Sequence, residues 1–227
     1  MKDLKSILKE CSIKEIYCDN YGAPITYVIP IYQRNYAWER DEICALIKDV
    51  HDSMDMGKTV YYIGTLVTYK RDENKYEVID GQQRLTTIYI ILRALGVHDI
   101  YNRLTYSARK ASASTIEALS GRGEKDDLGE MPDLGIKNGF DFAKAGLNEI
   151  VGLAQTDVDK FKEYFLNHVH IIHYRVPKDV DLNHYFEVMN SRGEQLEKHE
   201  IVKAKLSEQF IGDNTSMEKF SRIWEAC

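Results

Sequence analysis

The segment with the clearest chemical potential is DGQQR, at residues 80–84. It follows a run of β-forming residues and precedes a helical pattern in which Leu85, Ile88 and Leu92 share one face. The first N–H groups of a helix lack partners inside it, so they can hold a phosphate. Arg84 would lie in the first helical turn, where a cation opposes the helix dipole by roughly 0.3–1 kcal/mol. This position is reasonable if Arg84 holds an anion, either a phosphate or an acidic side chain.

The two glutamines of the segment extend this interpretation. Gln82 and Gln83 each offer a hydrogen-bond donor and an acceptor, which suits the edge of a base or a sugar. The alternative is a buried structural turn in which Arg84 pairs with Asp80 or Glu77. The residues alone leave both interpretations open.

A second cluster occupies residues 29–38, IPIYQRNYAW. Gln33 and Arg34 stand between aromatic residues directly after a predicted strand. Tyrosine and tryptophan can stack on bases, and arginine can bind phosphate. The alternative is an ordinary strand end with an aromatic side chain packed over it.

A third cluster, Asn190, Ser191, Arg192 and Gly193, forms a polar connection between two predicted helices. A helix–turn–helix DNA reader is the obvious hypothesis. The neighbouring charge is mixed, however, and glutamates disfavour a recognition helix lying in a DNA groove. His168, His170 and His173 resemble a metal set, but on a strand His173 would point away from the other two, so a structural role is favoured.

The elements that must position these clusters follow from hydrophobic periodicity. A hairpin is predicted from residues 61–69 and 75–79, and residues 120–135, rich in Gly and charge, are predicted to be a loop. Residues 21–32 are predicted to be extended, and further strands are predicted at 104–109 and at 168–177. Helices are predicted at 4–17, at 39–56, directly after residue 84, at 140–154, at 157–167, from 182, and at 198–210.

Composition limits the class of protein. The 227 residues are 44% hydrophobic, which is enough to build a core, and the net charge is −6 with a pI near 5.7. Bulk attraction to nucleic acid is therefore disfavoured, although a local basic pocket is compatible with 30 cationic side chains. No membrane span, signal peptide or CxxC pair is present, so we expect a cytoplasmic protein without membrane association. The helical spacing of Phe220 and Trp224 close to the final residue suggests a fragment of a longer protein.

Taken together, the motifs resemble the N-terminal domain of GmrSD-type, modification-dependent restriction enzymes. The resemblance rests on IPIYQRNYAW, YYIGTLV, VIDGQQRLTT, FEVMNSRGEQL and IVKAKL, covers roughly residues 25–210, and is most specific at DGQQRLTT. LTYSARKAS also resembles the family's middle strand and the arginine that follows it.

The resemblance implies an α+β fold with a ParB/sulfiredoxin-like core, a small mixed sheet and a mainly helical second part. The implied division is a nucleotide-binding core at 1–100 and a part at 101–227 that completes the pocket. The implied catalytic residues are Asp80, which the resemblance also implies as a Mg²⁺ ligand, and Arg84. The implied nucleotide- and phosphate-binding residues are Tyr32, Gln33, Arg34, Gly81, Gln82, Gln83, Asn190, Arg192 and Gly193.

The resemblance also implies a function. It is that of a nucleoside-triphosphate- and Mg²⁺-binding, modification-sensing regulatory domain in phage defence, with hydrolysis as an expectation. The implied partners are modified DNA and an HNH-type nuclease, as a C-terminal domain or separate subunit; homo-oligomerisation stays open. The alternatives are a non-enzymatic module that binds a DNA phosphate or modified base in the same pocket, and a structural adaptor.

Overall fold

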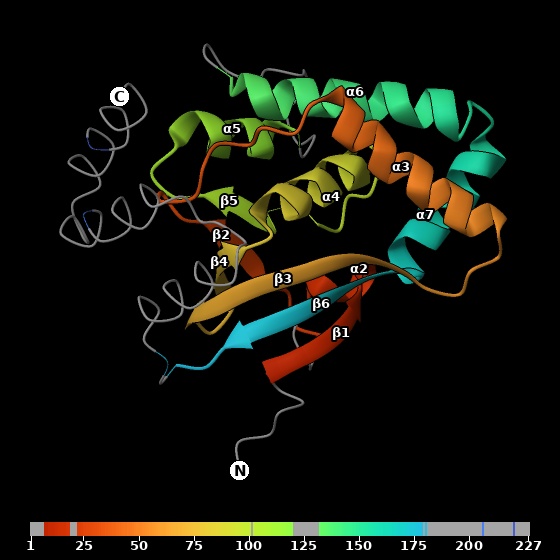
Figure 1. The fold of residues 1–227 in the computed structure, drawn as a ribbon. Helices are drawn as coiled ribbons and strands as arrows, with labels where there is room; N and C mark the ends of the chain where they lie inside the picture. The colour runs from red at the N-terminus through yellow and green to blue at the C-terminus, as the bar shows by residue number, and fades with distance from the viewer. Residues whose placement is uncertain are drawn as a thin grey trace.

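A computed structural model describes residues 7–18, 22–100, 102–119 and 132–178, together with the single residues 180, 206 and 220. Within these ranges the chain forms one six-stranded mixed sheet and six helices (Figure 1). The α+β class expected from the sequence is therefore confirmed. No helix in the described part of the chain is long and apolar enough to cross a membrane.

The sheet combines strands that are far apart in the sequence. Its order is β1-β6-β3-β4-β2-β5. β4, β2 and β5 are parallel neighbours, and β3 is parallel to β6, whereas the β1–β6 and β3–β4 pairs are antiparallel. Strands from both sides of residue 100 thus share one sheet. The strands are β1 (Leu8–Ser12), β2 (Thr26–Ile29), β3 (Tyr61–Asp72), β4 (Lys75–Asp80), β5 (Leu104–Tyr106) and β6 (Val169–Val176).

Helices cover one face of this sheet. Figure 1 shows α4 between the sheet and α6, and α6 packs on both α4 and α3. The helices are α2 (Ile13–Ile16), α3 (Arg40–Asp55), α4 (Gln82–Ala94), α5 (Lys110–Ala118), α6 (Leu134–Ile150) and α7 (Gln155–Asn167).

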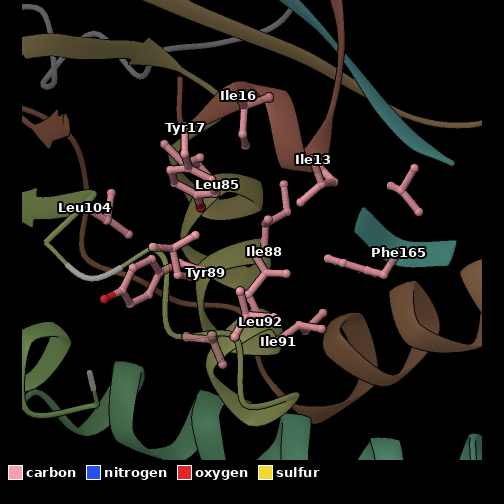
Figure 2. Close-up of a cluster of buried hydrophobic side chains, with 14 of the residues drawn as sticks. Ile13, Ile16, Tyr17, Leu85, Ile88, Tyr89, Ile91, Leu92, Leu104 and Phe165 are labelled. Atoms are coloured by element: carbon pink, nitrogen blue, oxygen red, sulfur yellow. The ribbon is translucent and has the colours of Figure 1, made fainter. Parts of the chain in front are cut away.

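The central helix α4 is buried on nearly all sides, as expected for a helix between two layers. Leu85, Ile88 and Leu92 have no exposed surface. Figure 2 shows them in one cluster with Ile13 of α2 and Phe165 of α7. Burying one such aliphatic side chain contributes about 1.5–3 kcal/mol to stability, so this cluster holds the start of α4 in a fixed position.

Most elements predicted from periodicity are present. The structure confirms the 39–56 helix as α3, the 61–69/75–79 hairpin as β3–β4, and the helix after residue 84 as α4. The strands expected at 104–109 and 168–177 are β5 and β6, and the helix expected at 157–167 is α7. The helices expected from 182 and at 198–210 lie outside the described ranges.

Two predicted boundaries are wrong. Within the expected 4–17 helix, Leu8–Ser12 is strand β1, because pairing with β6 overrides local helical spacing. The expected 120–135 loop ends earlier, since α6 begins at Leu134 rather than at 140. The Asp133 carboxylate caps this helix start by accepting a hydrogen bond from the N–H of Ile136 at 3.2 Å. Gly139 allows α6 to lie against the Tyr36 ring, which explains a glycine inside this helix. Residues 120–131 lie outside the described ranges.

The three histidines make separate contacts. His173 is buried, with its Nε2 2.8 Å from the Thr68 hydroxyl. His170 Nδ1 lies 2.7 Å from a Glu10 carboxylate oxygen, and His168 Nδ1 lies 2.9 Å from the carbonyl oxygen of Thr59. No group of three metal-ligating side chains occurs among the described residues.

Burial of His173 predicts a pH-dependent stability. Burial, with the positive charges of Arg175 and Lys9, lowers the pKa of His173 from 6.5 to about 3. The unfolded chain therefore binds one more proton than the folded chain between these values, so stability falls as the pH drops through this window. At about 1.4 kcal/mol per pH unit, we expect wild type to lose about 2 kcal/mol more than His173→Gln between pH 7 and pH 5. Urea unfolding at both pH values measures this difference, and identical pH profiles would contradict it.

Candidate functional site

The first two sequence clusters meet at one edge of the sheet. The parallel strands β4, β2 and β5 end there, and each continues into a polar segment. β4 continues into the DGQQR turn, β2 into the 30–37 loop, and β5 into residues 107–109. The carboxyl ends of parallel strands are a common place for ligands, because the segments that follow them converge.

The turn between β4 and α4 depends on Gly81. This residue precedes α4 in a left-handed conformation, with φ of 88°. A Cβ atom at position 81 would lie 2.8 Å from the carbonyl oxygen of Thr65 in β3. Glycine therefore allows both the backbone conformation and the close approach to β3.

Three glutamine amides hold the 30–37 loop against this turn. Gln33 donates from Nε2 to the carbonyl oxygen of Ile79 at 2.7 Å. Gln83 donates to the Asn35 carbonyl at 2.8 Å and accepts from the Ala37 N–H at 3.0 Å. These contacts give the glutamines a structural role at the place where the sequence predicts contacts to a base or sugar.

Gln82 differs from the other two glutamines. Its Nε2 lies 3.3 Å from the carbonyl oxygen of Arg34, but its Oε1 is buried and has no hydrogen-bond partner in the described part of the chain. A buried acceptor without a partner costs free energy, about 1–3 kcal/mol. A ligand donor is one way to satisfy it.

Arg109 joins the same network, although sequence reasoning did not place it in the site. Its guanidinium donates to the carbonyl oxygen of Ile31 at 3.2 Å, to that of Gln33, and to that of Arg34 at 3.5 Å. The available signal was its position, an arginine shortly after a predicted strand. Arg34 and Arg84 share that position.

The tyrosines of the loop are packed rather than open. Tyr32 donates from its hydroxyl to Glu77 at 2.9 Å, and the Tyr36 hydroxyl lies 2.8 Å from the Thr87 hydroxyl. Burial raises the pKa of Tyr36 above its ordinary value. Both rings therefore help to position the loop.

Arg84 does not form the ion pair that the structural alternative required. Its Nη1 donates to the carbonyl oxygens of Thr65 at 3.0 Å and of Ile63 at 3.4 Å. Gly64 lies between these two residues in the sequence, and a Cβ at position 64 would clash with the Arg84 guanidinium. Glu77 instead accepts from Arg71, at 2.5 Å. Within the described residues, no carboxylate pairs with Arg84.

The remaining predicted residues fall into two groups. Arg34 is exposed and Asp80 half-buried, and neither side chain makes a hydrogen bond or ion pair within the described ranges. Both residues adjoin the hydrogen bonds that Gln33, Gln82 and Gln83 make between the 30–37 loop and the turn. Asn190, Arg192 and Gly193 lie outside the described residues.

The electrostatics of this edge favour an anion. α4 and α5 both begin here, and neither has a side-chain cap or an acidic residue in its first turn. Each instead carries a cation there, Arg84 in α4 and Lys110 in α5. By contrast, the first turn of α3 contains two acidic residues, Asp41 and Glu42, beside Arg40. Helix N-termini whose own first turns contain no acidic residue attract negative charge, although Asp80 precedes α4 and the Asp133 carboxylate accepts a hydrogen bond from Ser112 of α5.

Comparison with known proteins identifies the family. No curated protein matches the chain. The family model of the GmrSD restriction endonuclease, N-terminal domain, matches residues 13–207, which include every element described above except β1. The chain therefore belongs to the family of GmrSD restriction endonuclease N-terminal domains.

Proposed function

We propose that this chain is the nucleotide-binding and hydrolysing regulatory domain of a DNA restriction system, and that it senses modified DNA. The observation that supports nucleotide binding is that α4 and α5 begin at the same sheet edge. The first turn of each helix contains a basic residue and no acidic residue. Family membership supports the role in restriction and hence in defence against phage.

In this proposal the open N–H groups at the start of α4 hold the phosphates, and Arg84 and Arg34 neutralise their charge. Asp80 has no partner among the described residues, so it is available to hold Mg²⁺ or to orient water. A bound Mg²⁺ would supply further neutralisation of phosphate charge.

The loop residues then have positioning roles. Tyr32, Gln33 and Gln83 hold the 30–37 loop, and the buried Oε1 of Gln82 is the candidate acceptor for a base or sugar donor. Asn190, Arg192 and Gly193 are assigned to the same pocket from the family resemblance alone. Hydrolysis would regulate an HNH-type nuclease in another domain or subunit.

Replacement of Arg84 by alanine tests the site. A charge-assisted hydrogen bond contributes roughly 1.5–3 kcal/mol, so Arg84→Ala should weaken nucleotide binding by about tenfold or more. Calorimetric titration with ATP and with GTP, with and without Mg²⁺, measures the loss. The matched control is Arg40→Ala, since Arg40 also lies in a first helical turn but pairs with Glu149 at 2.6 Å.

Unchanged nucleotide affinity in a folded Arg84→Ala protein would remove Arg84 from the site. A lower thermal transition with unchanged affinity would instead assign it a structural role through the carbonyls of Ile63 and Thr65. Binding of DNA but of no nucleotide would favour a non-enzymatic DNA-binding module.

A further inference from the structure

A second positively charged region lies at the opposite end of β4 from Asp80. Lys9 of β1, Arg175 of β6 and Lys70 of β3 lie on the face of the sheet that carries the main core. The pairings establish this: Lys9 is opposite His173, Arg175 is opposite Thr68, and Lys70 is opposite Tyr76. We call these three cations the basic diagonal.

Two members of the basic diagonal, Arg175 and Lys70, pack on one buried aromatic ring. The Tyr76 ring centroid lies 5.0 Å from the Arg175 guanidinium carbon and 5.7 Å from Lys70 Nζ. The electron-rich face of an aromatic ring attracts cations, so Tyr76 holds two like charges near each other. The ring itself is only 2% exposed, so it supports the cations and is not open to stacking by a base.

Within the part of the chain that the structure describes, no ion pair with a carboxylate neutralises this charge. Within the described ranges, Lys9, Lys70 and Arg175 form no ion pair, although Asp72 and Glu73 follow Lys70 closely in the hairpin. Glu10, the neighbour of Lys9, is on the other face and contacts His170 at 2.7 Å. The Nε of Arg175 is buried and has no hydrogen-bond partner among the described residues. Lys9, Lys70 and Arg175 are half-buried. The exposed Lys48 and the half-buried Lys137 do pair with carboxylates.

The spacing suits an extended polyanion. Each step along the diagonal crosses one strand and advances two residues, which separates the Cα atoms by roughly 8 Å. A single small anion would contact one or two such cations, whereas a chain of phosphates can contact all three. The polyanion consistent with a restriction-endonuclease domain is DNA.

We propose that the basic diagonal binds the phosphate backbone of DNA, on a surface separate from the nucleotide site at the DGQQR edge. His173 lies on β6, between the strands that carry Lys9 and Lys70, and it is buried and neutral. It therefore separates these cations without adding a fourth charge. The proposal uses the family's DNA substrate class and does not depend on nucleotide binding.

Charge removal at the two lysines tests this surface. Each phosphate contact contributes about 0.9 to the slope of log affinity against log salt. Lys9→Gln/Lys70→Gln should therefore reduce the slope by about 1.8 and weaken binding at 0.1 M salt by up to about 60-fold. Fluorescence anisotropy with a labelled duplex, at several salt concentrations, measures both. Arg175 is retained because it packs on Tyr76.

The matched control is Lys58→Gln/Lys162→Gln, which removes the same charge from two other lysines without ion pairs in the described structure. An unchanged salt slope in the Lys9/Lys70 variant, or an equal change in the control, overturns the proposal. Equal and equally salt-sensitive binding of poly-glutamate would overturn the assignment to DNA in favour of an acidic protein partner. ATP titration of the same variant should be unchanged, which separates this test from that of the nucleotide site.

Discussion

Replacing Gly81 by alanine should destabilise the domain by about 3–4 kcal/mol. A non-glycine residue in the left-handed region costs roughly 1–2 kcal/mol. The added Cβ would also lie 2.8 Å from the Thr65 carbonyl oxygen, a contact between two backbone segments that no side-chain rotation relieves. Overpacking of this kind adds typically 1–3 kcal/mol. Urea unfolding at neutral pH measures the total.

Gly96 provides the matched control for this substitution. It lies just after the other end of α4, also with positive φ, at 71°, but no atom of the described residues lies within 4 Å of the position that a Cβ would take. Gly96→Ala should therefore cost only the backbone part, about 1–2 kcal/mol. Equal losses for the two variants would show that the approach of β3 to the turn does not constrain the site.

Prediction from the sequence worked where the apolar pattern of one segment determines its structure. α3 and α4 have continuous helical faces, and the β3–β4 hairpin pairs neighbouring runs, so local periodicity was sufficient. Local periodicity could not predict β1, because its partner strand β6 is far away in the sequence. Glu10 of β1 and His170 of β6, which contact each other, are 160 residues apart. Its five residues become a strand only when β6 is present beside them.

The sequence singled out the two segments that meet at this sheet edge, but it did not predict their contacts. The sequence indicated that the DGQQR turn and the 30–37 loop carry related chemistry, and the structure joins them through Gln33 and Gln83. The sequence could not reveal that these amides bond to the backbone, since an amide offers the same donor and acceptor to a protein carbonyl and to a ligand. Arg109 was missed because its role depends on β5 lying beside β2.

The largest effect at the site beyond Gly81 is expected at Arg109. Its side chain is 8% exposed, and its guanidinium donates to carbonyl oxygens of three residues in one loop, Ile31, Gln33 and Arg34. The bonds to Ile31 and Gln33 are buried, so water cannot easily replace them. A hydrogen bond from a charged donor contributes roughly 1.5–3 kcal/mol, and carbonyls left buried without donors add a desolvation cost.

We therefore expect Arg109→Met, which retains an unbranched side chain, to lose about 3 kcal/mol of stability and to speed amide hydrogen exchange throughout residues 31–37. Nucleotide affinity should fall as well, because Arg34 lies on that loop. The control is Arg103→Met at the other end of β5, where the side chain makes no hydrogen bond or ion pair within the described ranges and the loss should stay within about 0.5 kcal/mol. Equal stability losses at the two positions, or unchanged exchange in the loop, would show that Arg109 does not hold the loop at the sheet edge.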